Sequence, residues 1–257
     1  MKYVEYAVKD RVGFITLNRP DKRNALSSEL VNDLKEAFTK AEADTAVKVV
    51  VLKAKGETFC AGADLEYLQQ LQNFSYEENL QDSNNLKALF LQIYMLKKVV
   101  IAQVQGHALA GGCGLATVCD FTFAVPEAKF GYTEAKVGFI PAIVLVFLLR
   151  KVGEMRTRHL LLSGNLILAE EAQALGIVSG IYAQLNIEEE VNKFAQSLVK
   201  NNSANSMTLT KQMIAQVYSL PLEESLKYAA ELNATVRSSD DCKKGIAAFL
   251  NKEKISW

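Results

Sequence analysis

Histidine is scarce in this chain of 257 residues, in which only His107 and His159 occur. This scarcity argues against a metal centre built on several histidines, and it leaves a Ser-His-Asp triad few candidates for its base. The four cysteines show no CxxC spacing, which argues against a zinc site or a disulfide framework. We therefore expect reduced thiols, no metal and a cytoplasmic location.

An excess of charge of one sign is also absent, since Lys plus Arg and Asp plus Glu each number 29. Proteins that bind nucleic acids usually carry a basic stripe, so we expect no nucleic-acid partner. The longest apolar run, Phe139 to Leu149, is too short to cross a bilayer and predicts a buried helix. The first residues lack the apolar core of a signal peptide, so we expect neither secretion nor a membrane partner.

Strand and helix patterns alternate up to about residue 182, and only helical patterns follow. We predict an α/β fold with a mixed body over residues 1–185 and a helical region over 186–257. The helices of this second region are expected at about 187–200, 205–218, 221–237 and 239–252. Such a tail can pack on a neighbouring subunit or fold back on its own body.

A glycine-rich segment follows the apolar strand predicted over Val99–Val104. Gly111, Gly112 and Gly114 let the backbone approach whatever lies above it, and a helix that begins there points free N–H groups outward. Such groups suit an oxygen that becomes negative during a reaction. Close helix–strand packing is the alternative explanation for these glycines.

A dinucleotide-binding fingerprint is a second alternative for this segment. Gly112 and Gly114 could supply its first two glycines, but Thr117 stands where the third Gly or Ala should be. The surrounding pattern is not that of a first βαβ unit, which argues against this interpretation.

Six short motifs occur in order along nearly the whole chain. They are Leu17-Asn18-Arg19-Pro20 with Asn24-Ala25-Leu26, Phe59-Cys60-Ala61-Gly62-Ala63-Asp64-Leu65, Gly106-His107-Ala108-Leu109-Ala110-Gly111-Gly112-Cys113, Cys119-Asp120, Phe130-Gly131-Tyr132-Thr133-Glu134-Ala135-Lys136-Val137-Gly138, and Ala172-Gln173-Ala174-Leu175-Gly176-Ile177-Val178. Each motif is weak alone, but together and in order they resemble the crotonase superfamily, the enoyl-CoA hydratase/isomerase family. The resemblance implies a crotonase-like spiral of ββα units with a C-terminal helical trimerisation region. It also implies an acyl-CoA thioester as substrate, a homotrimer or hexamer, and no cofactor beyond the coenzyme A that the substrate carries.

The resemblance also assigns an oxyanion hole to two backbone N–H groups. In this chain they fall on Ala63 and Gly111, both in small-residue loops that lead into predicted helices. Losing one such donor costs on the order of 3 kcal/mol of transition-state stabilisation. The resemblance thus agrees with the chemistry expected of the glycine-rich segment.

Further residues are expected to bind the substrate by resemblance. The coenzyme A body is expected over Lys22, Asn24, Ala25, Ala61 and Leu65. The substrate-binding residues beside the oxyanion donors and the carboxylate are expected to be Gly62, Asp64, Gly112, Gly114 and Thr133. The segment that begins at Asn24 can also be read as a turn that leads into a helix, and both readings can hold together.

The hydratases of this family use two glutamates, one on each side of a water. Glu134 matches the second position, but Gly114 occupies the first and has no acid or base function. A carboxylate in a partly apolar pocket can have its pKa raised towards the range of a general acid/base. One carboxylate favours the migration of a double bond from the 3- to the 2-position, for which a single base removes and returns a proton.

Hydration of a 2-enoyl-CoA nevertheless stays open, as do a methylglutaconyl-CoA-type hydratase, a hydrolase, a decarboxylase and a non-catalytic CoA-binding scaffold. An RNA-binding side function has no support in the neutral composition. The bulky apolar residues after Gly138 suit an apolar acyl chain, although they can equally be ordinary helix core.

Five further residues in the motifs have secondary interpretations. We expect His107 to pack beneath the glycine segment, and Asp64 to cap the helix that follows it. Tyr132 and Thr133 can orient the neighbouring Glu134. Cys113 has no general base nearby and is interpreted as a small buried filler.

Overall fold

The structure is a computed structural model that describes the whole chain, residues 1–257. Its larger sheet has six strands in the order β1-β2-β3-β5-β7-β10. These strands are β1 (Val4–Lys9), β2 (Val12–Leu17), β3 (Val49–Ala54), β5 (Val99–Val104), β7 (Phe121–Ala124) and β10 (Gly180–Ile181). β1 and β2 form an antiparallel hairpin, and the later strands of this sheet pair in parallel.

A second sheet of very short strands lies beside the first. It has the order β4-β6-β8-β9, with β4 (Thr58–Cys60), β6 (His107–Leu109), β8 (Lys129–Gly131) and β9 (Ile167–Leu168). β4, β6 and β8 run parallel, so the chain leaves all three at the same edge of the sheet. This edge carries the candidate functional site.

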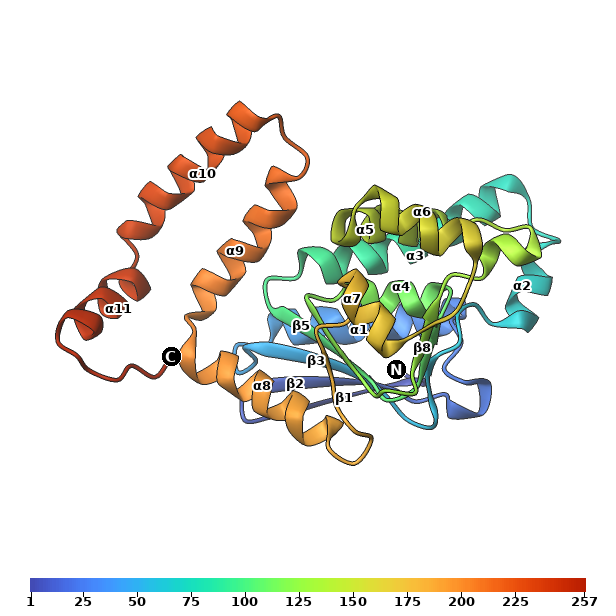
Figure 1. Cartoon of the computed structure of the whole chain (residues 1–257), viewed down its shortest axis with the longest axis horizontal. Coiled ribbons are helices and arrows are strands. Elements are labelled where there is room, and N and C mark those ends of the chain that lie inside the picture. The colour runs from blue at the N-terminus through green and yellow to red at the C-terminus, as the bar shows by residue number, and fades with distance from the viewer.

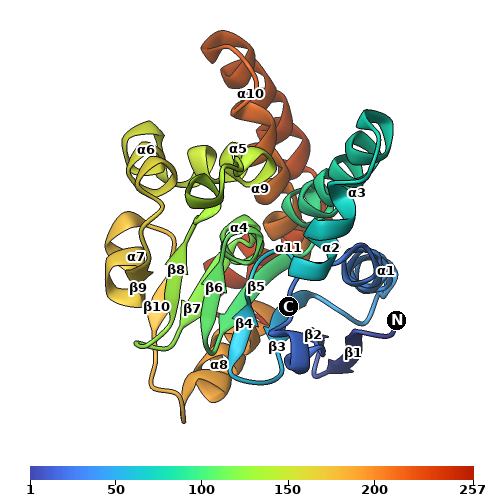
Figure 2. The same ribbon diagram turned by 90° about the vertical axis from the view of Figure 1, so that its right-hand side faces the viewer.

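Helices connect and cover the strands. They are η1 (Pro20–Lys22), α1 (Ser28–Ala43), α2 (Leu65–Leu71), α3 (Tyr76–Met95), α4 (Gly111–Val118), η2 (Glu134–Val137), α5 (Ala142–Val152), α6 (Glu154–Ser163), α7 (Ala169–Leu175), α8 (Ile187–Asn201), α9 (Ala204–Val217), α10 (Leu222–Arg237) and α11 (Asp240–Leu250). α1 and α4 lie over one face of the larger sheet and α8 covers the other (Figures 1 and 2). β5 is buried along its whole length because helices cover both faces.

The C-terminal helices differ in how they are packed. α8 buries Ile187, Val191, Ala195 and Val199 against the larger sheet. α9 contacts α3 and β5 and leads into α10 and α11, which project from the body as an arm (Figure 1), and α10 has no buried residue. The four helices predicted for this region are confirmed, and the projecting part follows α9.

The apolar run around α5 is not the fully buried helix that the sequence predicts. α5 buries Val144, Leu148 and Val152 on one side, whereas Phe139 and Ile140 before it are 61% and 68% exposed. The prediction was wrong because an apolar run does not reveal which face finds a partner in the same chain. No helix of this chain is both long enough and apolar enough to cross a membrane.

Candidate functional site

Three loops meet where β4, β6 and β8 end. Ala63 stands three residues after the end of β4, Gly111 two residues after the end of β6, and Glu134 three residues after the end of β8. Neighbouring strands lie about 5 Å apart, so the parallel pairing brings these loops side by side. The three residues predicted to be catalytic therefore belong to one site.

The backbone around Ala63 leaves its N–H group free. Leu26 N–H donates to Gly62 O at 2.7 Å, and Asp64 N–H donates to Leu26 O at 2.9 Å. This pattern is a parallel β-bridge between Leu26 and Ala63, in which the N–H of Ala63 points away from Leu26. Gly62 has φ +95°, and a Cβ on it would lie only 3.7 Å from Gly111 N, so the two loops are in contact.

Gly111 begins α4, and its N–H is one of those that a helix leaves without an intrahelical partner. The residue before it, Ala110, has φ 49° and ψ −123°, a conformation that an L-residue rarely adopts. Ala110 is held there by its N–H bond of 2.7 Å to Gly131 O and by Gly114 N–H, which donates to its carbonyl at 3.0 Å. The strained turn ends the strand abruptly and directs the start of α4 towards the Ala63 loop.

Glu134 supplies the acidic side chain on the third of these loops. Its Oε2 atom is buried and has no hydrogen-bond partner within the chain. Burial raises the pKa of Glu134 above its ordinary value. A carboxylate with a raised pKa and an unused oxygen is suited to take up and return a proton.

Gly114 does not face a ligand, and its predicted role in substrate binding is corrected. A Cβ built on it would lie 2.2 Å from Val144 Cγ1 and 3.1 Å from Phe90 Cε1. The place of the first family glutamate is therefore filled by side chains of α5 and α3.

Gly112 has a packing role as well. A Cβ on it would lie 2.2 Å from Cys60 O, so its backbone touches the end of β4 and leaves no room for substrate on that side. The packing explanation of the glycine segment thus holds for Gly112 and Gly114, whereas Gly111 carries the free N–H group.

Asn24 was predicted to touch coenzyme A, and this prediction is wrong. Asn24 is fully buried, and its Nδ2 donates to Lys55 O at 2.9 Å and to Thr58 O at 2.8 Å. Its Oδ1 accepts from Arg19 N–H at 2.9 Å. Every polar group of this side chain is thus used to fix the turn, and none is left for a ligand.

Asp64 is likewise occupied by the protein. Its Oδ1 accepts from the N–H groups of Glu66 and Tyr67, which confirms the predicted cap of α2. Its Oδ2 lies 2.6 Å from Arg19 Nη1. Burial opposes ionisation, but the bonds from Tyr67 and Arg19 hold the pKa of Asp64 below its usual value. Asp64 therefore positions the loop that carries Ala63 and has no oxygen free for the substrate.

The other residues predicted to bind substrate differ in their exposure. Lys22 is exposed, and its Nζ lies 2.5 Å from Glu66 Oε1. Leu65 is 77% exposed, whereas Ala25 is buried. Ala61 and Thr133 are half-buried, Ala61 before the Ala63 turn and Thr133 directly before Glu134.

The secondary interpretations have mixed outcomes. His107 is exposed, where its Nδ1 accepts from Lys129 N–H at 3.2 Å, so packing beneath the glycine segment is wrong. Tyr132 is fully buried, and its hydroxyl lies 3.1 Å from Thr117 Oγ1, so it bonds inside the core instead of to Glu134. Cys113 is the buried filler that we predicted, and burial raises the pKa of its thiol to about 11.

Sequence reasoning missed three residues that shape the site: Arg19, Phe90 and Val144. Arg19 lies in a motif that we quoted, yet no spacing in the sequence links it to Asp64. Phe90 and Val144 read as ordinary apolar positions of two helices, so nothing in the sequence shows that they fill the space beside Gly114. No group of three or more His, Cys, Asp or Glu side chains lies close enough together to hold a metal ion.

Comparison with known proteins gives one consistent result. The family model described as enoyl-CoA hydratase/isomerase matches residues 7–257. A Thermus thermophilus protein named as a candidate enoyl-CoA hydratase is 42% identical over 244 residues, covering 95% of this chain and 96% of its own length.

Solved structures agree with this match. A Legionella pneumophila protein described as a candidate enoyl-CoA hydratase/isomerase (crotonase) superposes with a TM-score of 0.90 at 37% identity, over 98% of both chains. An enoyl-CoA hydratase of Mycobacterium smegmatis superposes with a TM-score of 0.93 at 29% identity, over 99% of this chain and 98% of its own. The fold is therefore the crotonase fold, and this chain belongs to the enoyl-CoA hydratase/isomerase family.

Proposed function

We propose that this enzyme acts on the coenzyme A thioester of an unsaturated acid and moves its double bond from the 3- to the 2-position. The observation that carries the proposal is that Glu134 has a buried, unpartnered Oε2, whereas Val144 fills the space beside Gly114, at the position of the first family glutamate. Moving a double bond requires one group that removes a proton from one carbon and returns it to another. Glu134 has the unused oxygen and the raised pKa for this task.

In the proposed reaction, the N–H groups of Ala63 and Gly111 bind the thioester oxygen. Glu134 takes a proton from carbon 2, and the electron pair of that C–H bond moves towards the oxygen to give a dienolate. The two N–H groups stabilise the negative charge on this oxygen. Glu134 then gives the proton to carbon 4, the double bond settles between carbons 2 and 3, and the carboxylate is restored.

Hydration of a 2-enoyl-CoA is the second candidate, because several relatives are named enoyl-CoA hydratases. Hydration needs one group to activate water and another to protonate carbon 2, and the first family glutamate has no counterpart here, because Gly114 stands in its place. Glu134 would have to perform both steps on one water molecule. The geometry therefore favours isomerisation.

The proposed substrate has an apolar acyl chain. Phe139 and Ile140 follow Glu134 closely and expose most of their apolar surface, and Phe139 N–H bonds to Glu134 O at 3.0 Å. An acyl chain that covers them would remove this surface from water. For the coenzyme A body we propose contacts with Lys22, Ala25, Ala61 and Leu65, together with Gly62 and Thr133 beside the reacting atoms.

We also propose a homotrimer or hexamer in the cytoplasm, with no cofactor beyond the coenzyme A of the substrate. α10 is 16 residues long and buries none of them, and even its apolar residues Leu222 and Leu226 are 75% and 62% exposed. Most helical stability in proteins comes from tertiary packing, so a neighbouring subunit is the natural cover for this helix. Four unpaired cysteines fit a reducing compartment.

The proposal is tested by incubating the enzyme separately with a 3-enoyl-CoA and with a 2-enoyl-CoA and identifying the products by mass. We expect the 3-enoyl substrate to give a conjugated product of unchanged mass. A gain of one water from the 2-enoyl substrate, with no conversion of the 3-enoyl substrate, would establish hydration instead. If neither substrate reacts, the enolate mechanism fails for enoyl thioesters.

A further inference from the structure

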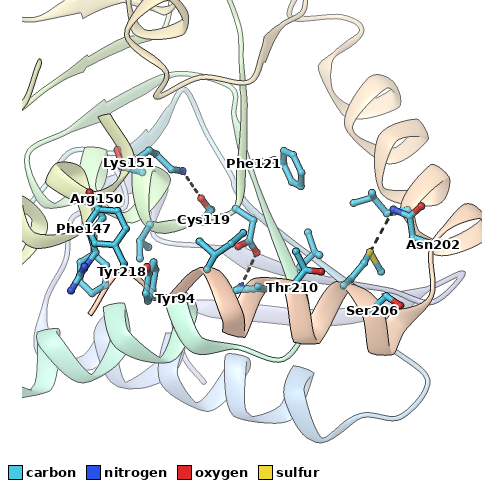
Figure 3. A pocket seen from close by; sticks show the side chains of 18 of the residues that line it. Tyr94, Cys119, Phe121, Phe147, Arg150, Lys151, Asn202, Ser206, Thr210 and Tyr218 are labelled. Carbon is cyan, nitrogen blue, oxygen red and sulfur yellow. Dashed lines mark hydrogen bonds and ion pairs between the residues drawn. The ribbon is translucent and has the colours of Figure 1, made fainter. Parts of the chain in front are cut away.

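A cavity of about 700 Å³ lies between α9 and the body of the protein (Figure 3). α9 lines it with residues that share one helical face: Ser206, Met207, Thr210, Lys211, Ile214 and Tyr218. The body contributes apolar and aromatic side chains, among them Tyr94, Phe121 and Phe147. A cavity of this size with an apolar lining and a few polar groups is typical of a small-molecule site.

This cavity is separate from the candidate active site. α4 reaches it with Thr117 and Val118 at its C-terminal end, whereas Gly111 begins the helix at the active site. The helix has eight residues, so the two ends lie about 10 Å apart. Neither Glu134 nor Ala63 lines the cavity.

The charges on the cavity wall do not balance. Three cationic side chains line it, Arg150, Lys151 and Lys211, but Asp120 is the only acidic side chain. Lys211 Nζ lies 2.7 Å from Asp120 Oδ2 and also donates to the carbonyls of Ile93 and Lys98 at 3.1 Å. Lys211 and Asp120 thus neutralise each other, and all three donors of Lys211 are used.

Lys151 and Arg150 are left without a carboxylate partner. Lys151 Nζ donates to Cys119 O at 2.6 Å, which uses one of its three donors, and burial lowers the pKa of Lys151. The Arg150 guanidinium lies 4.8 Å from the centre of the Tyr218 ring and makes no ion pair. In Figure 3 Arg150 lies beside Phe147 and Tyr218, and the neighbouring Lys151 points towards Cys119.

We propose that this cavity binds a single-chain anionic amphiphile, an alkyl chain that ends in a carboxylate. The carboxylate binds at the end where Arg150 and Lys151 have unused donors, and the chain lies along the apolar face of α9. α9 has 14 residues and is therefore about 20 Å long, which favours a long chain over a short one. The ligand supplies the negative charge that the two cations lack.

The chain offers a direct reporter of this binding. Trp257 is its only tryptophan, and it lines the cavity. Titrating the protein with dodecanoate, below its micellar concentration, should change the fluorescence of Trp257 in a saturable way. Dodecanol has the same chain without the charge, and we expect it to bind at least about tenfold more weakly, since a charge-assisted hydrogen bond is lost.

Variants separate this cavity from other sites. Arg150→Gln and Lys151→Met should each weaken dodecanoate binding by about tenfold or more, whereas Lys9→Gln removes an exposed charge elsewhere and should leave it unchanged. Glu134→Gln should also leave it unchanged. Arg150 is half-exposed, so its variant is expected to fold even if Lys151→Met does not.

Three results would overturn the proposal. The first is equal binding of dodecanol and dodecanoate, or of the Arg150→Gln and unaltered proteins. The second is loss of binding in Glu134→Gln, which would place the ligand in the active site. The third is that dodecanoate does not bind and that the oligomer of the Arg150→Gln variant dissociates in sedimentation. This result would make the cavity an interface between copies of this chain.

Discussion

Val144 occupies the space that any side chain at position 114 would need. A Cβ built on Gly114 would lie 2.2 Å from Val144 Cγ1 and 2.8 Å from Val144 Cβ. Heavy atoms that are not bonded do not approach so closely, so glycine at position 114 and valine at position 144 depend on each other. The absence of a second carboxylate is therefore part of the packing between α4 and α5.

This dependence predicts a non-additive pair of substitutions. Gly114→Ala should lower the free energy of unfolding by about 1–3 kcal/mol, because it overpacks the core. In the double variant with Val144→Ala, the loss should be smaller than the sum of the two single losses by about 0.5 kcal/mol or more. Chemical denaturation of the four proteins measures this coupling. Val199→Ala on α8 is the control, because its loss of unfolding free energy should simply add to that of Gly114→Ala. If the losses of Val144→Ala and Gly114→Ala also add, the contact between the two residues is refuted.

The oxyanion hole can be tested through Gly62, although its donors are backbone groups. Gly62 has φ +95°, and Gly62→Ala would place a Cβ only 2.9 Å from Ala110 Cβ. The loop that carries Ala63 must therefore move. We expect kcat to fall about 10²- to 10³-fold, the loss typical of one oxyanion donor. Gly153→Ala is the matched control, since Gly153 also has a positive φ but nothing lies within 4 Å of its Cβ position. Steady-state kinetics that show equal losses in both variants would contradict the assignment of Ala63.

Long patterns along the chain predicted most of the fold. The buried strand Val99–Val104 follows from an apolar run of six residues, and the C-terminal helices follow from helical patterns sustained over longer stretches. The smaller sheet was not predicted, because strands such as β8, with three residues, are too short to show a period. The resemblance brought Glu134, Ala63 and Gly111 together as one site.

The remaining features of the site depend on contacts between distant parts of the chain. Asn24 reads as an exposed turn residue, yet three backbone groups saturate its amide. Val144 lies 30 positions from Gly114 and reads only as an apolar helix residue. Neither contact leaves a signal in the local sequence.

The raised pKa of Glu134 predicts that its ionised carboxylate destabilises the folded protein. A carboxylic acid whose folded pKa lies above its ordinary value of 4.5 binds more protons in the folded than in the unfolded state between those two values. The ionisation of Glu134 therefore lowers the free energy of unfolding as the pH rises through this window, and it has no such effect below the window. We expect Glu134→Gln to be more stable than the unaltered protein at neutral pH, with a smaller difference below the ordinary Glu pKa. Thermal unfolding at both pH values checks this, and a less stable variant at neutral pH would be inconsistent with an unpaired carboxylate.

Asp64 should show the opposite dependence on pH. Its pKa lies below the ordinary 3.8, so its stabilising contribution is complete above that value and is lost as the pH falls through the lowered pKa. Asp64→Ala removes the cap of α2 and should cost about 0.5–2 kcal/mol at neutral pH. Asp64→Asn keeps a capping oxygen but loses the charge facing Arg19, so it should cost less. Urea denaturation of both variants measures this, and equal losses would show that the cap contributes little.

The central claim is that Glu134 alone moves the proton. The most direct measurement is the rate of conversion of a 3-enoyl-CoA to its conjugated isomer by the unaltered enzyme and by Glu134→Gln, with coenzyme A binding measured on both proteins. We predict that kcat falls about 10²- to 10⁴-fold, the contribution of a general acid/base, while coenzyme A binding stays unchanged. A Glu134→Gln variant that isomerises this substrate at the unaltered rate would contradict the account.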